Sequence, residues 1–352
     1  MHKKSQEIAI GDNDTENVFL LSSGHQMRHE NGGRGRNMSR AGHGGIISAK
    51  RKKNFWLTTM LLPGAVWLLL LRYLPMLGIT IAFKNYRAFK PNTFWNNILK
   101  SEWVGLKNFE FLKGPDTAVM IRNTLGYNIL WIVLGLVISV AFAVMMSELS
   151  TRFIAKTYQT MMFFPYFLSW VVASYFVLAF LDPTSGMINA IQKASGGSVT
   201  NFYHDTTWWP LILTICNLWK NVGYSTVLYL AAITGIDTTQ YEAAAIDGAT
   251  KWQQVRYVTL PNIRTMIIIL LIMNVGKIFN ADFGLFYNVP QNSGSLYPVT
   301  QVVDTFVYRA YANTHNLGMS SAAGFLQSAV GLVCIVGTNA IVRKIDPDSS
   351  LF

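Results

Sequence analysis

Several side chains able to bind a polar solute lie within apolar stretches of this sequence. In the stretch near residues 209–233 they recur every three or four residues, so a helix would present them on one face. They are Asn217, Lys220, Asn221 and Tyr224. The stretch near 264–286 adds Asn274 and Lys277. Because amide and ammonium groups hydrogen-bond to hydroxyls and carboxylates, these six residues are candidates for lining a solute path.

The same residues also have structural explanations. Polar groups inside a membrane are costly and are functional candidates by default, which applies to Arg72 and Asp282 as well. A lysine can instead pair with an aspartate inside a helix bundle, or extend its ammonium group to the membrane surface. The spacing alone leaves the path and the structural roles open.

Motifs for catalysis are absent from the sequence. There is no phosphate-binding loop of the form Gly-x-x-x-x-Gly-Lys-[Ser/Thr], no Gly-x-Ser-x-Gly elbow and no His-Glu-x-x-His pair. Most histidines lie near the N-terminus, and both cysteines, Cys216 and Cys334, fall in apolar segments. We therefore predict that the chain is not an enzyme and binds neither a cofactor nor a metal.

The elements that must position the polar residues are membrane helices. Apolar residues make up 51% of the 352 residues and charged residues 13%, which is about half the charged fraction of a soluble domain. Because about 20 residues cross the bilayer, we predict an all-α membrane protein with six transmembrane helices. The six apolar windows lie near 55–83, 120–146, 158–181, 209–233, 264–286 and 321–342.

The distribution of basic residues predicts the orientation. Ten of the 29 Lys and Arg residues lie in residues 1–53, in a polar tail that we expect to be disordered and to face anionic lipid rather than nucleic acid. Basic residues favour the cytoplasmic side, which predicts cytoplasmic N- and C-termini, although the outer segment 84–118 departs from this rule with six basic and three acidic residues. The predicted divisions are the tail 1–53, a first helix and outer loop 54–119, a helical core 120–345 with a cytoplasmic segment 236–263, and a C-terminal tail 346–352.

The polar segment 236–263 has the pattern of two helices joined by a glycine. Asp237 and Gln240 resemble a capping box that begins the first helix, and Gly248 can end it in the left-handed conformation. Thr250 and Gln253 repeat the capping pattern, and Pro261 is expected to follow the second helix. A solvated connecting loop and a docking element for another protein both fit this pattern.

The segment Glu242-Ala-Ala-Ala-Ile-Asp-Gly248, followed by Leu260-Pro261, resembles the EAA motif of binding-protein-dependent ABC importer permeases. The resemblance extends over most of 55–352. Within this family, the sequence is similar to the carbohydrate-uptake group, particularly its polysaccharide and complex-oligosaccharide branch. It implies a type I importer permease fold in which this segment docks into a cytoplasmic ATPase subunit. The coupling residues that it implies are Glu242, Ala243, Ala244, Asp247, Gly248, Leu260 and Pro261.

The resemblance also implies an assembly. It comprises two ATPase subunits that bind ATP and Mg²⁺, a second and different permease subunit, an extracellular or periplasmic solute-binding protein, and a carbohydrate substrate, in a bacterial cell membrane. An ion-coupled secondary transporter and a membrane anchor or sensor without transport activity are the alternative classes. A secondary transporter would be expected to contain inverted repeats, and the sequence shows no convincing repeat.

The resemblance suggests roles for aromatic and charged residues. Aromatic rings could stack on sugar rings, although such rings more often pack within a helix bundle. The candidates are Tyr166, Trp170, Trp219 and Tyr224. If the lysines face the path, an acidic sugar such as a uronate oligosaccharide becomes a hypothesis.

Overall fold

The computed structural model describes residues 58–87, 89–90, 93–149, 151–347 and 350–351. The chain divides into two compact units after Trp67, and almost all described residues belong to the second, Leu68–Phe352. The tail 1–53 lies outside the described residues, so its expected disorder and lipid contact stay predictions.

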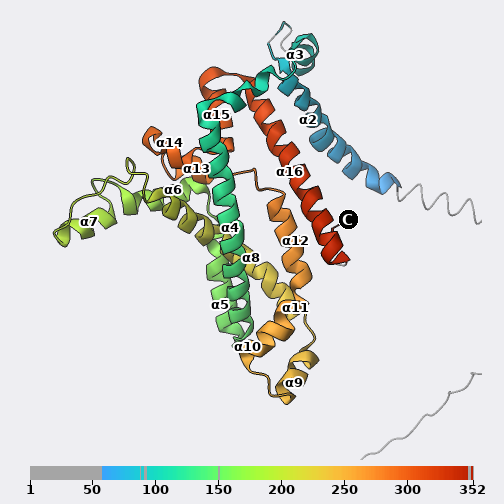
Figure 1. Ribbon diagram of the computed structural model, residues 1–352, viewed down its shortest axis with the longest axis vertical. Coiled ribbons are helices and arrows are strands. Elements are labelled where there is room, and N and C mark those ends of the chain that lie inside the picture. Colours follow the sequence, from blue (N-terminus) through green and yellow to red (C-terminus); the bar gives the residue numbers. More distant parts are fainter. Residues whose placement is uncertain (1–57, 88, 91–92, 150, 348–349, 352) are drawn as a thin grey trace, which may run out of the picture. The chain divides into compact units, whose positions relative to one another are not determined.

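Helices dominate the second unit (Figure 1), as the sequence predicts. The long ones are α4 (Pro115–Ser147), α8 (Trp209–Thr234) and α16 (Leu317–Ile345). The remaining α-helices are α2 (Leu74–Met76), α3 (Phe94–Lys100), α5 (Arg152–Phe163), α6 (Trp170–Leu181), α7 (Met187–Ala194), α9 (Thr238–Ile246), α10 (Lys251–Gln254), α11 (Leu260–Asn262), α12 (Arg264–Val275), α13 (Phe283–Asn288), α14 (Tyr297–Thr300) and α15 (Val303–Thr314). The π- and 3₁₀-helical segments are η1 (Leu69–Tyr73), η2 (Leu77–Phe83), η3 (Lys107–Lys113), η4 (Phe164–Phe167), η5 (Val255–Thr259) and η6 (Gly294–Leu296). Among the described residues, the only strands are β1 (Lys84–Asn85) and β2 (Glu102–Trp103), which pair antiparallel in the outer segment.

The described helices account for the predicted spans in different ways. Three helices are long and apolar enough to cross a membrane, namely Thr58–Phe83, Pro115–Ser147 and Leu317–Ile345, and two bent helix pairs could each form one more. The three helices correspond to the first, second and sixth predicted windows, and the two bent pairs correspond to the third and fifth windows. The fourth window is the unbroken helix α8, whose 26 residues extend about 39 Å. Its intramembrane amides and Lys220 make it more polar than those spans.

The third predicted span, 158–181, is broken rather than continuous. The helix Phe153–Phe167 meets α6 at an angle of 99°. Pro165 lies in the 3₁₀ turn η4 just before the break, and Leu168 is extended. Ser169 then begins α6 by accepting a hydrogen bond from the Val172 N–H at 3.2 Å. The predicted span is therefore a bent pair of helices, and the proline and the N-capping serine that accompany the bend lie four residues apart.

The fifth predicted window, 264–286, also contains a break. Helix α12 ends at Val275, and a turn leads to α13, whose first turn is capped by Asp282. Gly276 follows the end of α12, and a larger residue would not fit there because a Cβ would lie 2.3 Å from the Ile335 side chain on α16. The bent pair that includes α12 begins earlier, with the helix Lys251–Asn262, and bends by 60°.

Small residues allow α4, α5 and α8 to pack closely. Ser139 and Ala143 on α4 are fully buried, and the Ser139 hydroxyl donates to the Val222 carbonyl of α8 at 3.4 Å. A Cβ at Gly223 of α8 would lie 1.8 Å from the Met162 carbonyl oxygen of α5. Ser139 and Ala143, two small residues four positions apart on α4, therefore contribute to packing within this chain.

Candidate functional site

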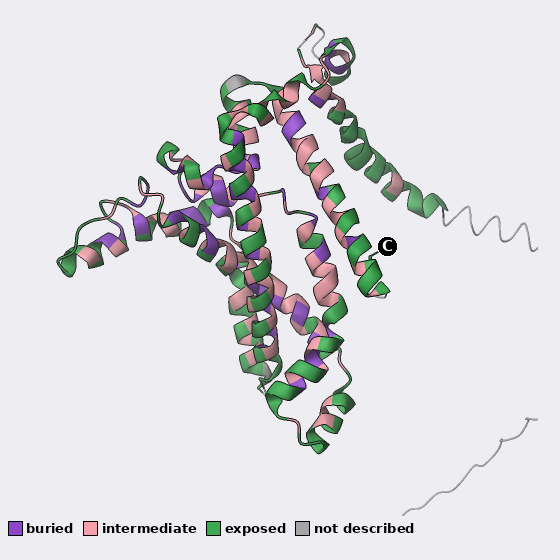
Figure 2. Cartoon of the chain, in the orientation of Figure 1, coloured by how far each residue is buried: buried purple, intermediate pink, exposed green. Residues whose placement is uncertain are grey.

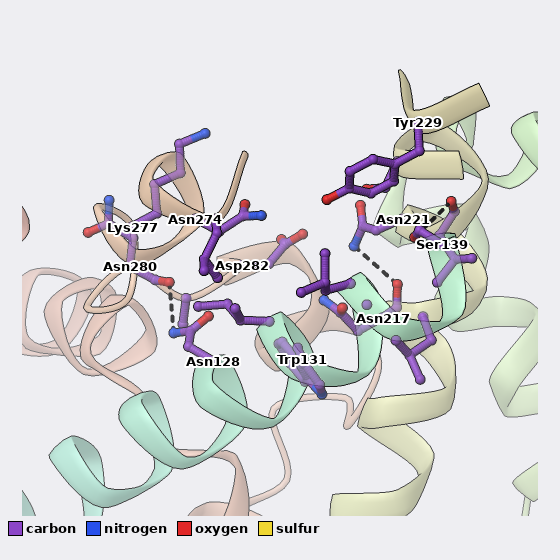
Figure 3. Close-up of a pocket in the computed structure, with 18 residues that line it drawn as sticks. Asn128, Trp131, Ser139, Asn217, Asn221, Tyr229, Asn274, Lys277, Asn280 and Asp282 are labelled. Carbon is purple, nitrogen blue, oxygen red and sulfur yellow. Dashed lines mark hydrogen bonds between the residues drawn. The ribbon is translucent and has the colours of Figure 1, made fainter. Parts of the chain in front are cut away.

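A polar cavity of about 420 Å³ lies between α4, α8 and the end of α12 (Figure 3). This volume falls within the usual range of small-molecule sites. Five of its polar lining residues are amides, supplied by three different parts of the chain. The polar and aromatic residues that line it are Asn128, Trp131, Ser139, Asn217, Asn221, Ser225, Tyr229, Asn274, Lys277, Asn280 and Asp282.

Hydrogen bonds hold part of this lining in place. The Asn128 amide on α4 donates to the carbonyl oxygens of Ile278 at 2.9 Å and Asn280 at 3.1 Å, so it fixes the turn after α12 against α4. On α8, the Asn221 amide donates to the Asn217 carbonyl at 3.1 Å. Trp131 donates to the Thr214 hydroxyl at 3.1 Å and is buried. The wall formed by α4 and α8 is therefore preorganised.

The two charged residues of the cavity differ in their partners. Both carboxylate oxygens of Asp282 are occupied: one accepts from the N–H groups of Gly284 and Leu285, and the other accepts from the Trp170 indole. The Lys277 side chain is exposed, and no ion pair or side-chain hydrogen bond joins it to another described residue. A Lys277–Asp282 pair, one of the structural explanations, does not occur among the described residues.

Four of the six residues predicted for a solute path line this cavity. Asn217 and Asn221 lie on one side, and Asn274 and Lys277 come from the other side (Figure 3). Lys220 and Tyr224 do not line it. On α8, Asn217 and Asn221 form one stripe that faces the cavity, and Lys220 and Tyr224 form a neighbouring stripe that contacts another part of the chain, so the expected shared face separates into two parts.

Lys220 and Tyr224 instead contact the break in the third span. The Lys220 ammonium group donates to the carbonyl oxygens of Leu168 and Tyr166, the latter at 3.0 Å, and thereby caps the end of η4. Tyr224 stacks on Tyr166 with ring centroids 4.7 Å apart. These contacts give both residues a structural explanation within the chain.

The structure places the predicted aromatic residues outside the cavity lining. Trp170 binds Asp282, and Trp219 contributes to a separate apolar pocket beside α6. Trp131 and Tyr229 take the position facing the cavity. Arg72 is exposed in the π-helical turn η1 and does not line the cavity either.

Sequence reasoning missed Asn128, Ser139, Asn280 and the two aromatic residues that line the cavity. Asn128 carried a usable signal, because it is an amide in the middle of the second apolar window. Asn280 carried the same signal, because it is an amide within the fifth apolar window. Trp131 and Tyr229 carry no such signal, since their rings resemble ordinary helix packing until three helices are assembled.

A second candidate site is the segment between α8 and α12. It lies at one end of the second unit, with α14 and α15 near the other end (Figure 1), and most of its residues are exposed (Figure 2). Glu242 and Asp247 are exposed, and Gly248 follows α9 with φ of 77°. The Ala249 N–H donates to the Ala244 carbonyl at 2.9 Å, which closes the C-terminus of α9.

The capping groups of this segment agree only partly with the predicted ones. Asp237 caps α9 by accepting from the Thr239 N–H at 3.0 Å, which also lowers the pKa of this carboxyl group. Gln240 does not complete a capping box; its side-chain oxygen accepts from the Asn262 amide at 2.8 Å. The box formed by Thr250 and Gln253 is present, as predicted.

Pro261 lies inside the second helix rather than after it. The elements α10, η5 and α11 form one helix, Lys251–Asn262, and Pro261 is its penultimate residue. A proline cannot donate a hydrogen bond to the preceding turn, and the π-helical turn η5 lies immediately before α11. Tyr241 of α9 meets the Thr259 hydroxyl at 3.0 Å, so the two helices of the segment are also joined by side chains.

A helical membrane bundle with a polar cavity among its spans, and with an exposed helix–glycine–helix segment at one end, defines the class of membrane transport permeases. Residues 132–349 match the family described as binding-protein-dependent transport system inner membrane component. The match covers more than half of the chain, and the chain belongs to this family. The match confirms the predicted resemblance.

Relatives and solved structures extend this result. The chain is 33% identical to Protein LplB of Bacillus subtilis (strain 168), over 88% of this chain and 95% of that protein. It is also 33% identical to the polygalacturonan/rhamnogalacturonan transport system permease protein YteP of the same organism, over 82% of this chain and 88% of that protein.

The crystal structure of a bacterial ABC transporter involved in the import of the acidic polysaccharide alginate contains a similar chain. Its TM-score is 0.75 at 29% identity, with 86% of this chain and 99% of that chain covered. A second structure of an alginate transporter, in complex with an alginate pentasaccharide-bound periplasmic protein, has a TM-score of 0.74 at 30% identity, with 84% and 97% covered. The chain therefore has the predicted type I ABC importer permease fold.

Proposed function

We propose that this chain is a membrane subunit of an ATP-driven importer and conducts oligosaccharides or polysaccharide fragments. The observation that carries this proposal is the cavity lined by amides of Asn128, Asn217, Asn221, Asn274 and Asn280. Amides donate and accept hydrogen bonds, as sugar hydroxyls do. The Asn128 N–H groups already donate within the chain, so its side-chain oxygen is the atom that it offers to a solute. The permeases and transporters named above, several of which handle polysaccharides, support the same substrate class.

The segment 236–263 is proposed to couple this cavity to ATP hydrolysis in a separate subunit. Glu242 and Asp247 are exposed, and the apolar side chains of Ile246 and Trp252 are 86% and 71% exposed. Exposed apolar side chains on a short, well-capped helix pair suit docking into a protein cleft. Ala243 and Ala244 keep α9 slim, and Leu260 and Pro261 lie at its return to α12.

The assembly proposed around this chain has five further components. They are two cytoplasmic ATPase subunits that hold ATP and Mg²⁺, a second and different permease, an extracellular or periplasmic solute-binding protein, and the saccharide. The complex would lie in a bacterial cell membrane with the segment 236–263 and both termini in the cytoplasm. The basic residues Lys251, Arg256 and Arg264 around that segment support this orientation.

Reconstitution tests the proposal. The chain is purified with the proteins encoded beside it and placed in liposomes, and uptake of a labelled oligosaccharide is measured with and without internal ATP while ion gradients are clamped. We expect uptake only with internal ATP, and copurification of one type of ATPase and a second membrane chain. Uptake that follows an imposed ion gradient without ATP would contradict the proposal.

A further inference from the structure

The two charged groups that line the cavity differ in how far hydrogen bonds within the chain satisfy them. Asp282 is the only carboxylate among the residues that line it, and its oxygens already accept from an indole and two backbone N–H groups. Lys277 is the only cation in the same lining. Its ammonium group pairs with no carboxylate and no carbonyl oxygen in the part of the chain that the structure describes. The cavity therefore presents one ammonium group with free hydrogen-bonding capacity, whereas its carboxylate is already hydrogen-bonded within the chain.

The contrast with Lys220 makes this charge informative. Lys220 also lies in an apolar helix, and its ammonium group is satisfied by carbonyl oxygens at the end of η4. Lys277 lies only three residues after Asn274, in the turn that the Asn128 amide holds against α4. A lysine on a fixed turn, without a protein partner, is available to a solute.

We propose that Lys277 makes the importer selective for saccharides that carry carboxylate groups, such as oligouronates. This inference rests on the proposed function and specifies its substrate class. The amides would bind hydroxyl groups, and Lys277 would pair with a carboxylate, in surroundings where a charge interaction is stronger than in water. YteP is named for polygalacturonan and rhamnogalacturonan, and the similar crystal structures concern the acidic polysaccharide alginate, which agrees with this chemistry.

The test measures binding to the complete importer without its solute-binding protein, because that protein would add its own selectivity. The purified complex in lipid nanodiscs is titrated with trigalacturonate, with the fully methyl-esterified trisaccharide, and with sn-glycerol 3-phosphate. The variants are Lys277→Met, Lys277→Arg and, as a matched control, Lys193→Met, which removes an exposed lysine on α7 outside the cavity.

We expect the unmodified importer to bind trigalacturonate at least about tenfold more tightly than its ester, which corresponds to about 1.4 kcal/mol. Lys277→Met removes this preference, whereas Lys277→Arg and Lys193→Met retain it. Equal binding of acid and ester, an unchanged preference in Lys277→Met, or equally tight binding of glycerol phosphate would overturn the inference. ATP-dependent uptake of a neutral oligosaccharide in the liposome assay would then leave the proposed function standing.

Discussion

The segment 236–263 and the cavity are built in opposite ways. The segment is contiguous in sequence, exposed, and held by its own caps, including the Thr250–Gln253 box. The cavity takes its lining from α4, α8 and the turn after α12, and depends on the close packing of those elements. The surface proposed to dock another subunit is thus encoded by one local pattern, whereas the site proposed for a solute requires the assembled bundle.

The largest effect is expected from Gly248→Pro in the segment. Gly248 has φ of 77°, whereas proline fixes φ near −65° and also removes the N–H that bonds to the Ala245 carbonyl. ATP-linked uptake should fall to background while the amount of protein in the membrane stays normal. Gly248→Asn is the matched control, because asparagine tolerates the left-handed conformation and should retain most uptake. Full uptake by Gly248→Pro at normal abundance would remove the coupling role.

The next effect concerns the framework of the cavity. Gly223→Val places a side chain where the Met162 carbonyl already lies, so α8 and α5 must separate. Overpacking of this kind costs about 1–3 kcal/mol and sometimes more. Membrane abundance and thermal stability should both fall. Gly126→Ala on α4 has open space around it and should change neither. A stable Gly223→Val protein would mean that α5 and α8 are not packed as described.

A smaller effect is expected from Asn221→Leu, which removes one amide of the cavity and keeps the side-chain volume. Uptake of an oligosaccharide should fall about tenfold, which corresponds to losing about one well-formed hydrogen bond. The ATPase subunit should still copurify in normal yield, because the segment 236–263 is untouched. If copurification fails together with uptake, the two regions are not separable as this comparison requires.

The smallest effect is expected at the ion pair between Lys251 and Glu148, whose charged atoms lie 2.9 Å apart. The two side chains are 74% and 43% exposed. Such pairs contribute about 0–1 kcal/mol to stability. Lys251→Met should therefore leave thermal stability almost unchanged and uptake within about a factor of two. A large loss of uptake with unchanged stability would instead indicate that Lys251 contacts the ATPase subunit directly.

The sequence predicted elements of the fold well where the pattern is long and periodic. The windows that became α4, α8 and α16 were placed within a few residues of their ends. The breaks at Leu168–Ser169 and after Val275 were missed, since a 99° bend leaves mean hydropathy unchanged. Pro165 and Ser169 were available as local signals for the first break.

The candidate site was only partly predictable. Amides in apolar windows identified Asn217, Asn221 and Asn274, because the cost of burying a polar group is a local property. Whether Lys220 faces a cavity or caps a helix depends on the path of the third span, which the linear sequence does not encode locally. For that reason Lys220 and Lys277 looked equivalent in sequence and have different surroundings in the structure.

The break at Ile263 gives the molecule a mechanical property. This residue ends α11 and begins α12, is 1% exposed, and packs with Ala143, Tyr229 and Ile233. From this fixed pivot, the 12 residues of α12 form an arm about 18 Å long with Asn274 near its far end. A rotation of about 10° at the pivot would move that amide by about 3 Å. That distance is about the length of one hydrogen bond, so a rotation of this size would break a hydrogen bond made by the Asn274 amide.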